Sequence, residues 1–184
     1  MLNHTPPFVV SAPSGILSGR DRGEELLVQI TDSMRDADPD GVMPLDFSAV
    51  EFIDISCADE FLTKLLMRIG SGEMGNRYVF IQNANQSVRE TLEAVLQLRS
   101  LAALYKHEEE VTLLGSLKTP IREALDVILE KKHGTSSEIA DALQKNINIA
   151  CNRLNTLQRM GLVCRVRDGS VQGGGRQFFY ESIL

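Results

Sequence analysis

Three carboxylates fall within a short stretch of the chain, at Asp54, Asp59 and Glu60. Paired carboxylates can act as general acid and base or hold Mg²⁺, but only beside a pocket and a partner electrophile. The sequence shows neither, and the attraction of an acid to the positive end of a helix explains Asp59 near a helix start. We therefore expect no catalytic residue, no metal site and no cofactor here. An enzyme that uses these acids is the least favoured of three functional hypotheses; the other two, a DNA-binding regulator and a protein-interaction adaptor, follow from the rest of the sequence.

Other reactive residue types do not combine into a site either. The chain has three cysteines, with no Cys-x-x-Cys pair among them, and its three histidines do not cluster with them: Cys57, Cys151, Cys164, His4, His107 and His133. This spacing argues against a disulfide framework and against a zinc site. The Gly70-Ser71-Gly72 run lacks the Lys-Ser/Thr of a phosphate-binding loop.

Positive charge is concentrated near one end of the chain. The whole sequence has a net charge of −6, but residues 1–116 hold nine basic and eighteen acidic residues, whereas residues 117–184 hold ten and seven. The two halves therefore carry −9 and +3. No acid occurs between Lys145 and Arg167. Such a split suggests different partners for the two halves, and an acid-free basic stretch favours contact with phosphates.

Alternating strands and helices must position the N-terminal acids. Apolar runs predict strands at residues 8–10, 16–17, 42–47, 52–53 and 78–81, and amphipathic patterns predict helices over about 22–37, 56–70 and 87–98. Ser56, with Asp59 three residues on, is expected to cap the second helix. The alternation predicts an α/β domain over residues 1–110, with a mixed sheet. A charged break at 106–110 and a linker over 111–118 are expected to end it.

Residues 119–184 are expected to form a second domain of α+β class. Helix-start patterns at Thr119-Pro120 and Thr135-Ser136-Ser137-Glu138 predict helices ending near 133 and 143. A third helix is expected from Asn148 to Met160, followed by strands at 162–166 and 177–180 around a glycine-rich tip at 168–175. Three helices and a hairpin are the order of a winged helix-turn-helix domain, whose last helix enters the DNA major groove.

The candidate DNA-contacting residues lie on that third helix and in the hairpin. Amides can bond adenine, and guanidinium groups can bond guanine or phosphate. The candidates are Lys145, Asn148, Asn152, Arg153, Asn155, Thr156, Arg159, Arg165, Arg167 and Arg176.

The C-terminal domain resembles the winged-helix regulators of bacteria and archaea. Their "IA..L" and "L..L...GLV" spacing is matched by Ile139, Ala140, Leu143, Leu154, Leu157, Gly161, Leu162 and Val163. The resemblance covers about 65 residues, at core and turn positions. It implies transcription regulation and binding to two-fold DNA sites as a homodimer.

The segments LDFSAVEFID (45–54) and ISCADEFL (55–62) are similar to the STAS superfamily of anti-sigma-factor antagonists and transporter tails. They are closer to a STAS-like family of unknown function, and the resemblance spans roughly residues 8–110. It implies a protein-binding role for this loop, with Asp54, Ser56, Asp59 and Glu60 as interaction or switch residues. In the antagonists a serine directly after the aspartate is phosphorylated. Here Ile55 takes that place, so phosphorylation of Ser56 stays an alternative to its capping role.

The sequence as a whole predicts a DNA-binding regulator whose acidic domain binds a protein partner. The hydrophobic content of 43% and charged content of 24% are those of ordinary soluble globular proteins. Neither a secretory signal nor a membrane-spanning run is evident, so we expect a cytoplasmic protein. The alternative is a protein-interaction adaptor that partners a kinase-like ATPase and does not bind DNA.

Overall fold

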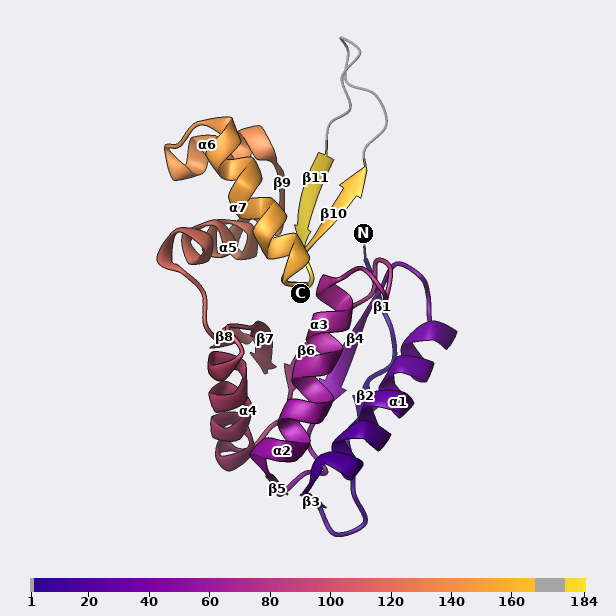
Figure 1. The fold of residues 1–184 in the computed structure, drawn as a ribbon. Coiled ribbons are helices and arrows are strands. Elements are labelled where there is room, and N and C mark those ends of the chain that lie inside the picture. Colours follow the sequence, from indigo (N-terminus) through magenta and orange to yellow (C-terminus); the bar gives the residue numbers. More distant parts are fainter. Residues whose placement is uncertain (1, 168–177) are drawn as a thin grey trace. The chain divides into compact units, whose positions relative to one another are not determined.

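The computed structural model describes residues 2–167 and 178–184, and the chain divides into two compact units. The N-terminal unit is Leu2–Ser116, and the C-terminal unit begins at Leu117 (Figure 1).

A mixed sheet forms the centre of the N-terminal unit. Its strands are β1 (Asn3–His4), β2 (Phe8–Val9), β4 (Gly41–Asp46), β6 (Tyr78–Gln82), β7 (Ala102–His107) and β8 (Glu110–Gly115). They run in the order β1-β4-β6-β7-β8, with β2 also paired to β4, and only the β7–β8 pair is antiparallel within the described residues. The expected α/β class with a mixed sheet is confirmed. β1, β7 and β8 were not expected.

Helices connect the parallel strands. They are α1 (Arg20–Asp36), α2 (Ile55–Ala58), the π-helical turn η1 (Asp59–Thr63), α3 (Lys64–Gly70) and α4 (Gln86–Leu98). The connections from β2 to β4, from β4 to β6 and from β6 to β7 each lead to the adjacent strand, always in the same direction across the sheet. Right-handed crossovers of this kind place their helices on one face of the sheet. The helices contact one another, and Figure 1 shows them together in front of the strands.

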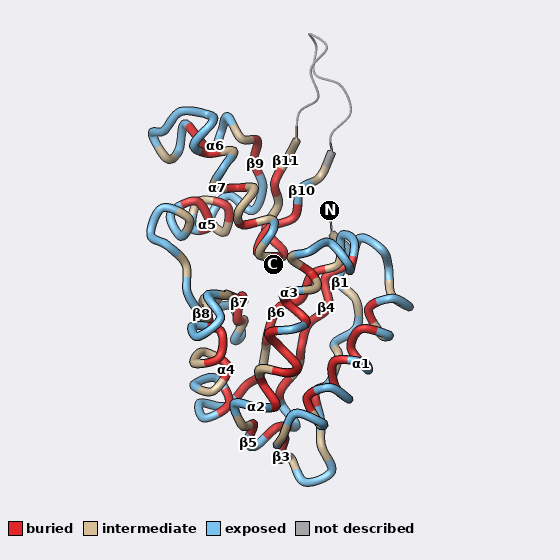
Figure 2. Tube along the Cα trace, viewed as in Figure 1, coloured by how far each residue is buried: buried red, intermediate tan, exposed pale blue. Residues whose placement is uncertain are grey.

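The core lies between this helical layer and the sheet. Its fully buried side chains include Phe47, Phe61, Leu26, Ile30 and Leu92, and Figure 2 shows the inward sides of α1 and α3 as buried. The layer is tightly packed at Gly23 of α1, where an added Cβ would lie 2.7 Å from both the Cys57 carbonyl oxygen and the Glu60 Cβ. Two short strands outside the main sheet, β3 (Ile16–Leu17) and β5 (Phe52–Ile53), pair in parallel.

The boundary between the two domains was predicted at the wrong position. Residues 106–110, expected to break the domain, end β7 and form the turn into β8, and β8 occupies most of the expected linker at 111–118. The turn places Glu108 at φ +53° without the glycine or asparagine that usually marks such a hairpin. The alanines at the start of β7 also give little strand signal. The division between the units falls after Ser116.

The C-terminal unit combines helices with a small antiparallel sheet. Its elements are α5 (Thr119–Lys131), β9 (His133–Thr135), α6 (Ser136–Leu143), α7 (Ile147–Arg159), β10 (Val163–Arg167) and β11 (Phe178–Ser182). The strand order is β10-β11-β9. The three expected helices and the two-strand hairpin are present, whereas β9 was missed because it has only three residues between two helices.

Side chains fix the ends of α6 and α7. Thr135 and Glu138 form the predicted capping box: the Thr135 hydroxyl accepts from the Glu138 N–H, and the Glu138 carboxylate accepts from the Thr135 N–H. These hydrogen bonds lower the pKa of Glu138. The Asn146 side chain accepts from the Ile149 N–H, so α7 begins at Ile147, one residue before its predicted start.

Candidate functional site

The outward face of α7 is the first candidate site. Ala150, Leu154 and Leu157 are buried on the inner side of this helix. At 3.6 residues per turn the opposite stripe contains Asn148, Asn152 and Arg159, and all three are exposed. No described residue forms a hydrogen bond with the side chain of Asn148, Asn152 or Arg159. The predicted contact residues at these positions therefore do point away from the core.

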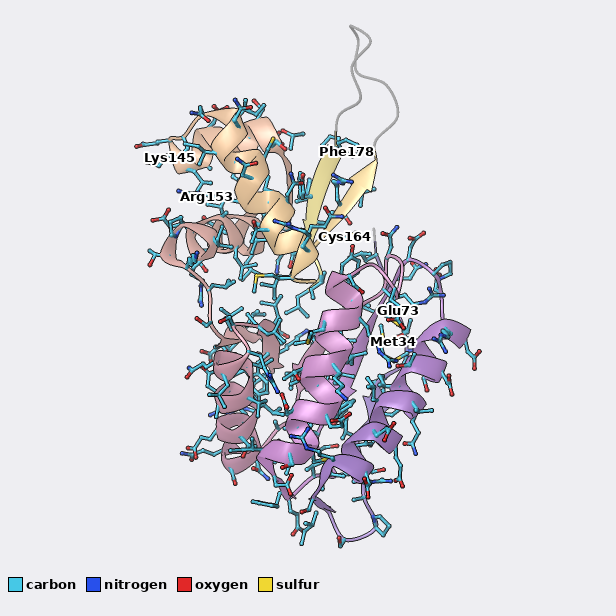
Figure 3. The ribbon with its side chains drawn as sticks, viewed as in Figure 1. Met34, Glu73, Lys145, Arg153, Cys164 and Phe178 are labelled. Atoms are coloured by element: carbon cyan, nitrogen blue, oxygen red, sulfur yellow. The ribbon has the colours of Figure 1, made fainter. Side chains whose placement is uncertain are left out.

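Two other predicted contact residues on α7 are turned toward the fold. The Arg153 side chain is only 12% exposed, and its Nη1 donates to Glu123 Oε2 of α5 at 2.9 Å; Figure 3 labels Arg153 on the side of α7 next to α5. The Asn155 Oδ1 accepts from the Tyr180 hydroxyl of β11 at 3.1 Å. Arg153 was predicted to contact DNA, but α5 packs beside it and supplies a carboxylate that pairs with its guanidinium.

Further basic and apolar groups are exposed at the start of α7 and on β10. Lys145 is exposed at the α6–α7 turn, and the Arg165 guanidinium of β10 lies 4.5 Å from the centroid of the Phe178 ring. Ile147 and Ile149 are 50% and 39% exposed at the start of α7. The structure buries Ala150, which follows Ile149 in the sequence, and leaves Ile149 at the surface.

The remaining predicted contacts are Thr156, Arg167 and Arg176. Thr156 is half-buried and donates to the Asn152 carbonyl oxygen of its own helix. Arg167 is the last residue of β10. Arg176 and the expected tip at 168–175 lie outside the described residues.

The acids near α7 in the described part of this unit have internal roles or lie on other elements. Glu123 pairs with Arg153, Glu138 caps α6, and Asp141 is exposed on α6. The stretch from Lys145 to Arg167 itself contains no acid.

The start of α2 is the second candidate site, and its acids hold the fold together. Asp54, rather than Ser56, caps α2: its Oδ1 accepts from the Cys57 N–H at 2.7 Å, and its Oδ2 accepts from the Ser18 hydroxyl at 2.5 Å and the Gly19 N–H at 2.9 Å. Burial alone would raise the pKa of Asp54, but these hydrogen bonds outweigh it and the pKa is lowered. The carboxylate thereby joins the starts of α1 and α2.

Ser56 lies at the second position of α2 and is exposed. The predicted capping role of Ser56 is wrong, since the cap is two residues earlier. The neighbouring Cys57 thiol is buried, and burial, together with the Asp54 charge, raises its pKa to about 11. A thiol with so high a pKa is a poor nucleophile at neutral pH.

Asp59 and Glu60 are each paired with basic side chains. Arg99, just after α4, donates to both Asp59 oxygens, from Nε at 2.8 Å and from Nη2 at 2.6 Å. This bidentate pair lowers the pKa of Asp59. Glu60 is buried in η1, where it contacts Lys64 and, at 3.3 Å, Arg20 of α1. The predicted cluster is therefore divided: Asp59 pairs with Arg99 just after α4, and Glu60 pairs with Lys64 of α3 and Arg20 of α1.

A hollow of about 320 Å³ beside these pairs was not anticipated. It is lined by Ile55, Asp59, Val95, Leu98 and Arg99. Ile55 is 54% exposed and Leu98 is 75% exposed, so its rim is apolar. The exposed Ile16 and Phe52 are partners in the neighbouring β3–β5 pair. Single exposed apolar residues in the sequence gave no sign of this grouping, because they come from distant segments.

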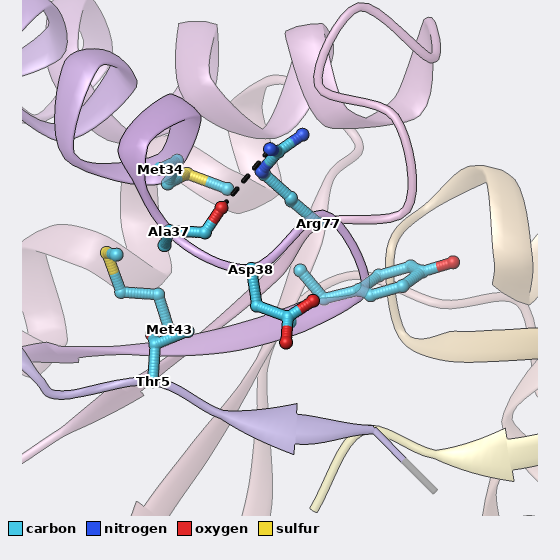
Figure 4. Close-up of a pocket in the computed structure, with 8 residues that line it drawn as sticks. Thr5, Met34, Ala37, Asp38, Met43 and Arg77 are labelled. Atoms are coloured by element: carbon cyan, nitrogen blue, oxygen red, sulfur yellow. Dashed lines mark hydrogen bonds between the residues drawn. The ribbon is translucent and has the colours of Figure 1, made fainter.

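A smaller cavity lies at the end of α1 (Figure 4). Its volume of about 10 Å³ leaves room for roughly one water molecule. Arg77 closes it: Nη2 donates to the Arg35 and Ala37 carbonyl oxygens, and Nη1 donates to that of Met74. The guanidinium thereby satisfies carbonyl groups at the end of the helix, which is a structural role.

No protein-family model matches the chain, and no curated protein sequence matches it. Within the described ranges, no group of three or more His, Cys, Asp and Glu side chains could hold a metal ion. Of the helices that the structure describes, none is both long and apolar enough to cross a membrane.

Proposed function

We propose that the C-terminal unit is a winged helix-turn-helix domain that binds duplex DNA, and that the chain is a transcriptional regulator. The element order α5-β9-α6-α7-β10-β11 and the antiparallel β10-β11-β9 sheet support this assignment. In such domains the second of two packed helices enters the major groove. Here α6 and α7 pack together, and α7 is the second.

The outward face of α7 is the observation that carries the proposal. It presents amide and guanidinium groups at Asn148, Asn152 and Arg159 in a stretch without acids. Such groups suit base edges and phosphates, and each phosphate neutralised adds affinity by releasing counterions. Lys145 and Arg165 extend the positive charge at either side in the sequence.

Fluorescence anisotropy with the full chain tests DNA binding. A duplex enriched from a random pool should bind with an affinity that falls steeply as salt rises. The double variant Asn152→Ala with Arg159→Ala should lose about 10- to 100-fold in affinity. The matched control is Arg122→Ala on α5, which also removes one guanidinium, but one already paired with Asp126. Absence of salt-sensitive binding, or equal losses in both variants, would overturn the proposal.

We propose further that the N-terminal unit is a STAS-like domain that joins two copies of the chain. The apolar rim of the hollow at Ile55 and Leu98 supports a protein contact, since exposed apolar groups gather there. Its charged members, Asp59 and Arg99, neutralise each other, so two copies of this surface can meet without local repulsion. A symmetric dimer would suit the two-fold sites that such DNA-binding domains bind.

Sedimentation measurements of Ile55→Asp and Leu98→Asp test the dimer. Each variant should dissociate it, whereas Val28→Asp, which places the same charge on an apolar position of α1 about as exposed as Ile55, should not. A wild-type chain that stays monomeric at high micromolar concentration contradicts the dimer. The same apolar rim also fits an adaptor function. Capture of a kinase-like ATPase by this unit, with DNA affinity at background, would favour that alternative.

A further inference from the structure

Residues 147–152 at the start of α7 present amides and isoleucines but no guanidinium group. Asn148 and Asn152 are exposed four residues apart, so they lie one above the other on the outward face. Ile149 lies at the edge of this face and is 39% exposed. Residues 147–152 contain neither Arg nor Lys.

Neither arginine of α7 joins these residues on the outward face. Arg153 is held by Glu123 and nearly buried. Arg159 lies at the far end of the helix, about 10 Å along the axis from Asn152 at a rise of 1.5 Å per residue. A helix that enters the major groove contacts base edges with its N-terminal residues. Arg159 is therefore placed for the phosphate backbone rather than for a base.

These residue types match one kind of base pair. An asparagine amide donates to adenine N7 and accepts from adenine N6, whereas the thymine methyl is the apolar group that the major groove offers. Guanine is usually bonded by Arg or Lys, and Lys145 is the nearest cation along the chain before α7. Burial of Ile149 against a methyl group would also remove its exposed apolar surface from water.

We infer that α7 selects A·T base pairs in the major groove, with Asn148 and Asn152 bonding adenine and Ile149 contacting a thymine methyl. This inference rests on the proposed DNA binding. It assigns Arg159 to affinity and residues 147–152 at the start of α7 to sequence preference.

Base analogues test the inference on the unaltered protein. A site is first enriched from a random duplex pool, and A·T pairs are expected at its conserved centre. Replacing adenine there by 7-deazaadenine removes the N7 acceptor and should weaken binding about 10-fold or more. Replacing thymine by uracil removes only the methyl group and should weaken it about 3-fold or more, as expected for one buried methyl.

Matched variants assign each loss to a side chain. The double variant Asn148→Ala with Asn152→Ala should bind natural and 7-deazaadenine sites equally, and Ile149→Ala should bind thymine and uracil sites equally. Arg159→Ala should weaken binding to all sequences alike and remain sensitive to both analogues. Thermal melts of each variant confirm that it is folded.

Two negative results have different meanings. A centre of G·C pairs, or indifference to both analogues in a protein that binds duplex DNA, overturns the A·T preference and leaves the proposed function intact. Failure to bind any duplex overturns the proposed function and this inference with it.

Discussion

The start of α2 and the outward face of α7 are both rich in polar side chains, but only one of them uses these groups internally. At α2, Asp54 joins two helix starts, Asp59 pairs with Arg99, and Glu60 pairs with basic residues on either side. On α7, Asn148 and Asn152 have no side-chain hydrogen bond to any described residue. The difference separates residues that stabilise the fold from residues that remain available to a ligand.

The two regions also differ in what their polar residues suggest from sequence alone. Three acids and a serine near α2 resemble a reactive cluster, but two basic partners of these acids, Arg20 and Arg99, each lie 40 residues away in the chain. The exposed residues of α7, Asn148, Asn152 and Arg159, do not resemble a reactive cluster in the sequence. A polar residue is thus informative about function only after its internal partners are known.

The largest predicted effect tests the tight packing around α2. Gly23→Leu places a side chain where even a Cβ meets the Cys57 carbonyl oxygen at 2.7 Å, and it should lower the free energy of unfolding by about 3 kcal/mol. Gln29→Leu, which adds the same residue on the exposed face of α1, should change it by less than about 0.5 kcal/mol. Urea unfolding followed by circular dichroism measures both. Similar midpoints would show that α1 and α2 are not packed as described.

The next effect tests whether Asp54 is a structural cap. Asp54→Ala removes an acceptor for the Cys57 N–H and should cost about 1–2 kcal/mol of stability. Asp54→Asn keeps a capping oxygen and should retain more than half of that stability. DNA affinity should not change in either variant. If Asp54→Asn is as damaging as Asp54→Ala, the charge rather than the cap is what matters.

A smaller predicted effect distinguishes the stabilising role of Arg153 from the DNA-binding role of Arg159. A double-mutant cycle of Arg153→Ala and Glu123→Ala should give a coupling of about 1 kcal/mol in stability, because Arg153 is mostly buried but Glu123 is half exposed. Arg159→Ala should leave stability unchanged and weaken DNA binding more than Arg153→Ala does. The opposite order of DNA affinities would place Arg153 in the interface.

The smallest predicted effect is a pH dependence of stability that comes from the Asp59–Arg99 ion pair. The bidentate hydrogen bond from Arg99 lowers the pKa of Asp59, so this pair contributes stability above the unfolded-state value near pH 4. The contribution, about 0.5 kcal/mol for a solvent-accessible pair, is lost as the pH falls through the lowered folded-state pKa. Unfolding of the wild type and Asp59→Asn between pH 6 and 3 measures it. The two curves should converge at the acidic end, and parallel curves contradict the assignment.

Local patterns predicted most helices and several strands correctly. The Thr135–Glu138 capping box and the helical spacing of Leu154 and Leu157 needed only near neighbours, and both were found as expected. The β7–β8 hairpin and β9 were missed. Their signals are short or unusual, with Glu108 at positive φ and only three residues in β9.

The sequence by itself determined the separation of charge, the two-part organisation and the apolar stripe that orients α7. These depend on composition and on contacts within a few residues. The tertiary structure decided which polar groups remain available: it bound Arg153 to Glu123, Asn155 to Tyr180 and Asp59 to Arg99, at separations of 30, 25 and 40 residues. A side chain's partner depends on which elements pack beside it, and that packing is set by the whole core rather than by any local segment.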